Sequence, residues 1–96
     1  MLNGADVLYI RAKASYSVFV LTNRQEVLSS LPIAMYGRLF HNECFFRVHR
    51  SFLVNLEHVV EIVRSGDVIL TGGVEVPITK EHIKALVIAL AALNEK

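Results

Sequence analysis

Apolar and polar positions alternate along several short stretches of the chain, and this two-residue period is typical of β-strands. In the first half, alternation predicts a strand over residues 44–49, and β-forming residues predict one over 7–12. Residues 16–22 are apolar on both faces, which predicts a strand covered on each side, and the turn after it leads to a return strand over 26–30. In the second half, the pattern predicts shorter strands over 59–64, 68–70 and 74–78. The last three are separated by Ser-Gly-Asp and Thr-Gly-Gly, which favour tight turns. Strands joined by such short turns run antiparallel.

Two other stretches show the helical period instead. Residues 30–40 predict a short helix with Ser30 as its cap and Pro32 in its first turn. The apolar residues that recur at helical spacing are Leu31, Met35, Leu39 and Phe40. From Thr79 onward the sequence predicts a second helix that Thr79 caps. Its apolar stripe consists of Ile83, Leu86, Val87, Leu90 and Leu93. The width of that stripe fits either burial on the domain's own sheet or contact with a partner helix. The expected fold class is therefore mainly β, with short antiparallel strands, a short internal helix and a C-terminal helix.

Composition limits the chain to one compact domain, and we assign it residues 1–96. The chain is 53% hydrophobic and 20% charged, so it can bury a core. Its only cysteine, Cys44, excludes an internal disulfide and fits a reducing compartment. The sequence has no apolar run of about 18 residues and no signal-peptide pattern at its start, so we expect a cytoplasmic protein, or a fragment of one, that does not enter a membrane.

The candidates for catalysis and metal binding are weak. Ser51 lies two residues from His49, so a strand would place both on one face, but no glycine-framed nucleophile turn surrounds Ser51. His41, Cys44 and His49 lie within nine positions, yet their spacing matches no paired-ligand zinc signature. A phosphate-binding Gly-rich loop with its Lys-Ser/Thr is also missing. We therefore predict no enzyme activity, no metal and no cofactor.

Basic residues gather in three regions, although the net charge is only +1. Arg11 and Lys13 flank the first loop, Arg47 and Arg50 lie on either side of His49, and Lys80 and Lys84 open the last helix. Such a set could bind phosphates and base edges of a nucleic acid. Scattered Lys and Arg are more often a solvated surface, and composition alone favours that interpretation.

The central stretch changes this balance. Residues 45–55 read FFRVHRSFLVN, which resembles the signature of the LytTR-type (LytR/AlgR-type) DNA-binding domain. The matching residues are Arg47, His49, Arg50, Ser51 and Asn55. The segments VLYIRAKASYSVFVLTNRQEVLSSL and VEVPITKEHIKAL are similar to the opening and closing parts of that family, so the resemblance covers about residues 6–90.

The resemblance implies an elongated β domain of a bacterial transcription regulator, commonly a response regulator of a two-component system whose sensory domain lies outside this chain. Such domains bind double-stranded DNA at direct repeats in promoters, with loops inserted into successive major grooves. A homodimer on DNA is a separate expectation, which an open strand edge would favour.

The same resemblance implies which residues face DNA. The first loop would be Lys13 to Tyr16, and the second would centre on Arg50 and Ser51. The third would be Thr79 and Lys80 together with Glu81 or Lys84. Arg50 is expected to contact a base edge, because a guanidinium fits guanine O6 and N7. Lys13, Ser51, Thr79 and Lys80 are expected to contact phosphates. Arg47 and His49 either contact DNA or brace the loop, and Asn55 is expected to hold the turn that follows.

Three features depart from the family pattern. Tyr16 stands where some relatives have a histidine or another polar donor. Glu81 places a carboxylate near the expected phosphate path, which costs affinity unless Glu81 points away or accepts a hydrogen bond from a cytosine amino group. Family members often have one more strand before the segment that matches residues 7–10. Either that strand is absent here or the fragment begins within the domain, and the edge of the partner strand would then be open to dimerisation. The alternative function is therefore a protein–protein interaction module that uses the apolar C-terminal helix and an open strand edge.

Overall fold

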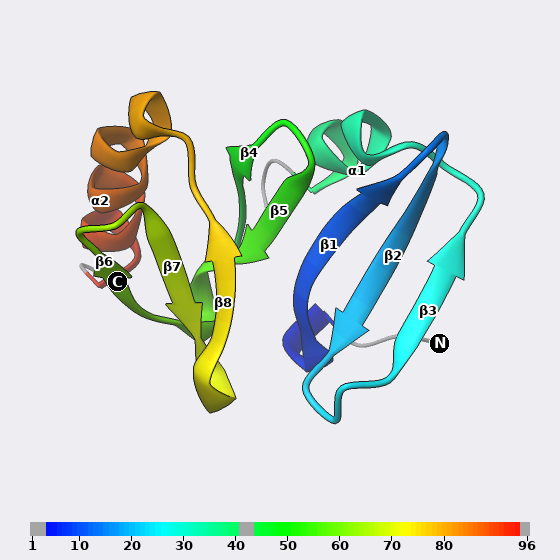
Figure 1. Cartoon of the computed structure of the whole chain (residues 1–96), viewed down its shortest axis with the longest axis horizontal. Helices are drawn as coiled ribbons and strands as arrows, with labels where there is room; N and C mark the ends of the chain where they lie inside the picture. The colour runs from blue at the N-terminus through cyan, green and yellow to red at the C-terminus, as the bar shows by residue number, and fades with distance from the viewer. Residues whose placement is uncertain (1–3, 41–43, 95–96) are drawn as a thin grey trace.

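The protein consists of two antiparallel sheets and two α-helices, in a computed structural model that describes residues 4–40 and 44–94 (Figure 1). The first sheet has strand order β3-β2-β1-β5-β4 and the second has order β6-β7-β8. The strands of the two sheets are β1 Val7–Lys13, β2 Tyr16–Leu21, β3 Glu26–Ser29, β4 Phe45–His49, β5 Phe52–Asn55, β6 Val59–Val63, β7 Asp67–Leu70 and β8 Val74–Pro77. The helices are α1 Ile33–Leu39 and α2 Lys80–Asn94, with short 3-10 turns at Gly4–Asp6, Leu56–His58 and Thr71–Gly73. The predicted fold class is confirmed.

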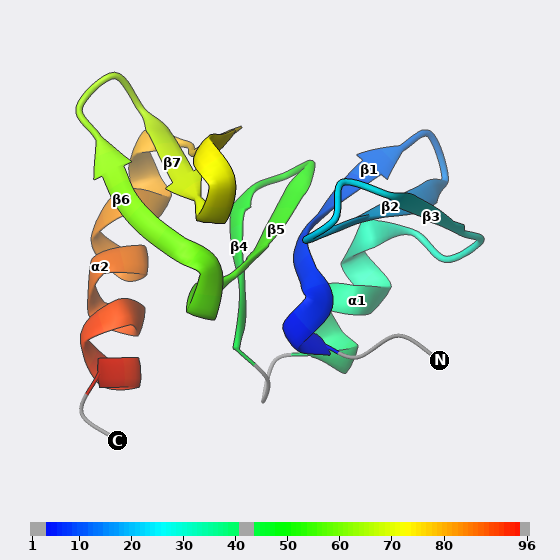
Figure 2. The same ribbon diagram turned by 90° about the horizontal axis from the view of Figure 1, so that it is seen from below.

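The central strands β1 and β5 of the first sheet contribute to a hydrophobic cluster on each face. Figure 2 shows α1 against one face, whereas the second sheet and α2 lie to the other side of β4 and β5. The described part of the protein has two hydrophobic clusters, one that includes Ile33 of α1 and one that includes Leu86 of α2. Neighbouring residues of β5 point into different clusters, because Leu53 packs in the first and Val54 in the second. This alternation explains why β5 is apolar on both faces.

Helix α1 begins later than the sequence predicts. Its first residue is Ile33, its N-cap is Pro32, and no side chain caps it, so the predicted start at Ser30 is wrong. The physical reason is the proline, which disfavours helical backbone in the residue before it. Two residues of the predicted apolar face, Leu31 and Leu39, are exposed, whereas Phe40 of the same face packs against the sheet.

Aromatic contacts select the face of α1 that meets the sheet. Ile33 is buried, the ring of Tyr36 lies edge-on to Phe19 with centroids 4.8 Å apart, and Phe40 stacks on Phe45 at 5.3 Å. The 3.6-residue period alone could not distinguish this face from its neighbour, because both carry large apolar side chains.

Helix α2 packs on the domain's own core. Leu86 is fully buried, and Ile83 and Leu90 pack against the same cluster. Val87 belongs to the predicted stripe but is 51% exposed, and Ile88 beside it is 61% exposed. The helix therefore buries a narrower face than expected and leaves apolar side chains on its outer side.

The structure also tests the expected open strand edge and the expected elongated shape. The strand at 7–12 has no open edge, because β1 pairs with β2 on one side and with β5 on the other. The open-edge part of the interaction hypothesis is therefore wrong for β1. The predicted elongation is slight, since the Cα extents are 31 × 25 × 25 Å.

Candidate nucleic-acid interface

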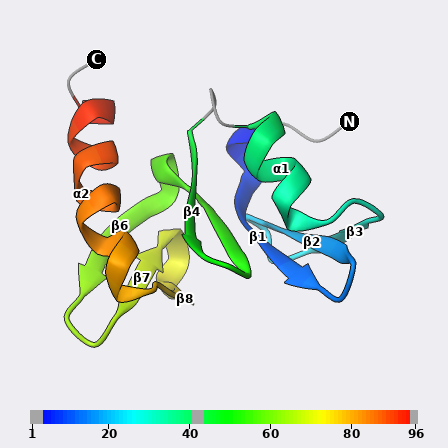
Figure 3. The same cartoon turned by 90° about the horizontal axis from the view of Figure 1, so that it is seen from above.

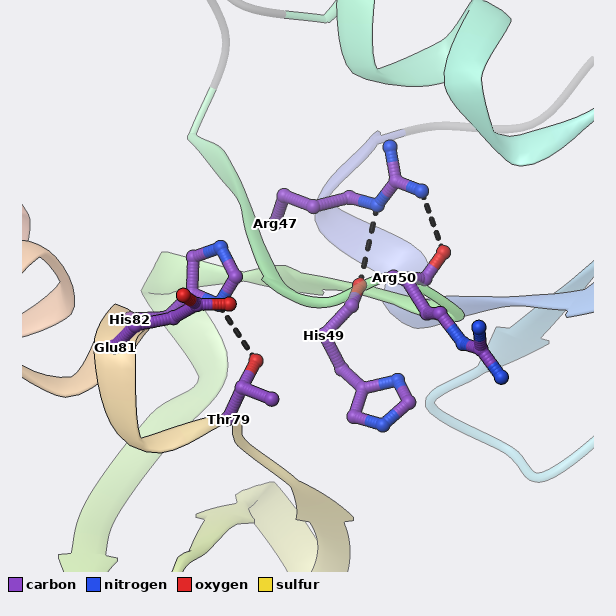
Figure 4. Close-up of a pocket in the computed structure, with 6 residues that line it drawn as sticks. All are labelled: Arg47, His49, Arg50, Thr79, Glu81 and His82. Atoms are coloured by element: carbon purple, nitrogen blue, oxygen red, sulfur yellow. Dashed lines mark hydrogen bonds between the residues drawn. The ribbon is translucent and has the colours of Figure 1, made fainter.

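The turn between β4 and β5 presents Arg50 to solvent. The turn is formed by Arg50 and Ser51, and the strand pairing slips by one residue just before it, between Arg47 and His49. This bulge, followed by the turn, is why the apolar alternation of the sequence fails at Arg50. Arg50 is exposed, and its guanidinium points away from the turn in Figure 4.

Two neighbouring side chains brace this turn from within. Nε of Arg47 donates to the carbonyl oxygen of His49 at 3.1 Å, and Nη2 of Arg47 donates to the carbonyl oxygen of Arg50 (Figure 4). Nδ1 of His49 accepts a hydrogen bond from the backbone N–H of Ser51 at 3.0 Å, and its ring packs edge-on to Phe52. The bracing contacts that the sequence left open for Arg47 and His49 are therefore present.

The same bond argues against a Ser–His hydrolase. The ring nitrogen of His49 that faces Ser51 is occupied by the backbone N–H of Ser51, not by its hydroxyl. The metal hypothesis has no support within residues 4–40 and 44–94, where no group of three His, Cys, Asp or Glu side chains could hold an ion. His41, which that hypothesis included, lies outside the described residues.

The start of α2 is tied directly to β4. The carbonyl oxygen of Val48 accepts from the backbone N–H of Thr79 at 2.9 Å and from its hydroxyl at 3.0 Å. The Thr79 hydroxyl oxygen also lies 2.6 Å from Nδ1 of His82. Because the hydroxyl hydrogen is given to Val48, Nδ1 of His82 must donate here. Thr79 therefore joins two elements and has no hydrogen left for a phosphate oxygen.

This link creates a depression of about 440 Å³ between the β4–β5 turn and the start of α2. Figure 4 shows the six residues that line it, which are Arg47, His49, Arg50, Thr79, Glu81 and His82. The sequence analysis missed His82. The signal that could have found it is the three-residue spacing from Thr79 across the first helical turn, which brings the two side chains together.

The first loop is the turn between β1 and β2. Lys13 and Tyr16 are opposite each other across the hairpin, and both are exposed, Tyr16 by 47%. Ala14 between them adopts a left-handed backbone with φ 54°. Arg11 is not available at this loop, because its guanidinium pairs with Glu26 at 2.8 Å.

Three cationic segments lie in one row. The β1–β2 turn, the β4–β5 turn and the start of α2 all lie along the upper edge of Figure 1, and Figure 3 shows them side by side from above. We call this row the basic ridge, and it carries Lys13, Arg50 and Lys80, all exposed. Lys84 is exposed one helical turn beyond Lys80 and does not line the depression.

A further cation next to the basic ridge was missed. Arg64, directly after β6, lines a second depression of about 410 Å³ together with Lys80 and Ile83. Arg64 is exposed. Its position directly before the Ser-Gly turn was the available signal, since a cation at a turn can join other loop tips.

Asn55 is buried and holds the end of β5. Its Oδ1 accepts from the backbone N–H of Glu57 at 3.0 Å, and its Nδ2 donates to the carbonyl oxygen of Val7 at 2.9 Å. The predicted structural role of Asn55 is confirmed.

A small β domain with exposed cationic loop tips in one row has the form of a nucleic-acid-binding module. The comparisons with known proteins identify its family. Residues 1–91 match the family of the LytTr DNA-binding domain, and the chain belongs to that family. The family is one of DNA-binding domains and not of enzymes. Within the described residues, no helix is long and apolar enough to cross a membrane.

Similar proteins come from Bacillus. The sensory transduction protein LytT of Bacillus cereus is 27% identical over 90 residues, which are 90% of this chain and 36% of that protein, and the protein of the same name in Bacillus anthracis gives the same values. The chain thus spans about a third of the length of these curated relatives. The LytTr DNA-binding domain of a protein described as a methyl-accepting/DNA response regulator from Bacillus cereus has the same fold. Its TM-score is 0.81 at 20% identity, over 93% of this chain and 84% of the other.

Proposed function

We propose that this chain is the promoter-reading domain of a bacterial transcription regulator and that it binds direct repeats in double-stranded DNA through loops in successive major grooves. The observation that carries the proposal is the basic ridge, in which the exposed Arg50 is held at the tip of a braced turn. Membership of a DNA-binding family supports it. The name of the LytT relatives, sensory transduction protein, supports a regulator that responds to a signal.

The residues on the ridge have different tasks in this proposal. Arg50 reads a base edge, because a guanidinium can donate two hydrogen bonds to guanine O6 and N7. Lys13, Lys80 and Lys84 contact phosphates as point charges, and the hydroxyl of Ser51 adds a neutral contact. Tyr16 offers an exposed ring and hydroxyl to the groove. Arg47, His49 and Thr79 act through the backbone that they hold.

The size of the domain fits this mode of binding. Its longest Cα extent is 31 Å, close to the roughly 34 Å rise of one turn of B-DNA. One copy can therefore reach neighbouring grooves on one side of the duplex. Two copies that lie in the same orientation would need a direct repeat spaced by about one or two helical turns, roughly 10 or 21 bp.

The test is selection of bound sites from a random DNA pool, followed by affinity measurements over a range of salt concentrations. Arg50→Ala should weaken binding to the selected site by about 1–3 kcal/mol and flatten the preference at one base position. Lys80→Ala should weaken all sequences similarly and reduce the salt slope by about one.

Arg24→Ala is the matched control. Arg24 is an exposed cation in the turn between β2 and β3, which lies at the lower edge of Figure 1, opposite the ridge. It should leave affinity and base preference unchanged. Unchanged specific affinity in Arg50→Ala would remove Arg50 from the readout. A lack of salt-sensitive binding to any DNA in the pool would end the proposal.

One observation favours a second candidate function, a protein–protein interaction module. Val87 and Ile88 are more than half exposed on the outer side of α2. A homodimer on DNA could use this face. Sedimentation of the purified chain tests it, because a stable dimer that Ile88→Glu dissociates would support the face as an interface. A monomer at all concentrations would rule out this face as a homodimer interface, and DNA binding would remain as the proposed function.

A further inference from the structure

Glu81 places a carboxylate within a surface otherwise suited to DNA. It lies in the first turn of α2 and lines the 440 Å³ depression together with Arg50. Figure 4 shows Glu81 on the α2 side of the depression, across from Arg50, which comes from the β4–β5 turn. The depression therefore has an acceptor on one side and a donor on the other.

The carboxylate is not neutralised by the cations near it. Across residues 4–40 and 44–94, the ion pair found is Arg11 with Glu26, and Glu81 makes no side-chain hydrogen bond there. Arg47 lines the same depression but gives its donors to the carbonyl oxygens of the turn. Both oxygens of Glu81 therefore remain available to a ligand.

The chemistry of the major groove limits what this carboxylate can bind. Phosphates repel it, and thymine O4 and guanine O6 and N7 are acceptors that it cannot use. Only the amino groups of cytosine N4 and adenine N6 donate, and carboxylates recognise cytosine in this way. A donor such as Arg50 beside an acceptor such as Glu81 matches guanine acceptors beside a cytosine amino group.

We propose that Glu81 is a specificity-determining residue, which accepts a hydrogen bond from the N4 amino group of a cytosine in the groove that Arg50 enters. This inference rests on the proposed DNA-binding function. The Glu81 carboxylate would then select the base sequence of the site, and would not only weaken DNA binding by repelling phosphates.

A purely structural role would have a different signature. A carboxylate in the first turn of a helix interacts favourably with the helix dipole, so Glu81 also contributes to the stability of α2. Removing that contribution would lower thermal stability and leave base preference unchanged. Base preference is therefore the readout that separates the two roles.

The experiment selects sites from a random double-stranded pool with the wild-type chain, Glu81→Ala and Glu81→Gln. The wild-type protein should prefer cytosine at one position by about tenfold over thymine or guanine. Glu81→Ala should lose that preference only, with the position read by Arg50 unchanged. Glu81→Gln should shift the preference toward adenine, because an amide pairs with adenine N6 and N7.

Glu75→Gln is the matched control, because Glu75 is an exposed carboxylate on β8 that lines neither depression. It should retain the wild-type preference. The inference is overturned if both Glu81 variants bind every sequence more tightly with unchanged preferences, since the carboxylate then only repels phosphate. If the wild-type chain shows no salt-sensitive binding to any DNA, the proposed function fails together with the inference. If the wild-type chain binds DNA but the Glu81 variants keep its base preferences, only the inference fails.

Discussion

Replacing Arg47 with methionine should loosen the turn that presents Arg50. Methionine keeps an unbranched, flexible stem but removes both donors of the guanidinium. The carbonyl oxygens of His49 and Arg50 then lose the bonds from Nε, at 3.1 Å, and from Nη2. Because these carbonyls belong to the turn itself, the variant should act on the free protein, before any DNA is bound.

The structure limits the size of this effect. A hydrogen bond from a charged donor contributes about 1.5–3 kcal/mol when it is protected from water, but Arg47 is only half-buried and one of its two bonds is exposed. About 1 kcal/mol for each bond is therefore appropriate, or about 2 kcal/mol in total. That value shifts the opening equilibrium of the turn by about 30-fold.

The assay is hydrogen exchange of the backbone amide of Ser51, which donates to Nδ1 of His49 and so reports on the closed turn. In the absence of DNA, this amide should exchange about 30-fold faster in Arg47→Met than in the wild type. Arg50→Ala is the control, and it should exchange at the wild-type rate. Both variants should lose specific DNA affinity.

The reasoning would be refuted if Arg47→Met left the exchange of Ser51 unchanged and weakened specific binding as much as Arg50→Ala. Arg47 would then contact DNA itself.

Two further substitutions test the scaffold by chemical denaturation. Asn55→Ala should lower the free energy of unfolding by about 2–4 kcal/mol, because it leaves the buried carbonyl oxygen of Val7 and the N–H of Glu57 without their partner. A loss below about 1 kcal/mol would show that water replaces these bonds. Gly37→Ala should raise the free energy of unfolding by about 1 kcal/mol, since alanine favours the helix and its Cβ would meet Nη1 of Arg47 at an ordinary 3.7 Å. The DNA affinity of Gly37→Ala should equal that of the wild type. A lower free energy of unfolding would mean that the Arg47 guanidinium cannot tolerate the contact with the new Cβ.

Much of the fold could be predicted from local patterns. The strands predicted at residues 7–12 and 16–22 correspond to β1 and β2. Ile83, Leu86 and Leu90 of the predicted stripe form the buried face of α2, whereas Val87 is exposed. Strand β5 was not predicted, because its apolar residues do not alternate with polar ones. Leu53 and Val54 pack in cores on opposite faces of the sheet, and only the tertiary structure shows that both faces are covered.

The helix α1 shows a second limit. Its sequence carries apolar residues on more than one side, and only contact with Phe19 and Phe45 decides that Tyr36 and Phe40 face the sheet. The proline at position 32 was visible in the sequence, but its effect on the preceding residue outweighed the capping preference of Ser30.

The central signature was sufficient to identify the family and to single out Arg50, because residue type and order within FFRVHRSFLVN are local properties. The tertiary structure decided what those residues do. Arg47 and His49 turn toward the backbone of the turn only because the bulge and hairpin bring its carbonyls and amides within reach. Glu81 joins Arg50 in one depression only because Thr79 bonds to Val48, 31 positions earlier in the chain. Residue patterns record which face of each element is apolar, whereas contacts between distant segments determine which loops and side chains meet.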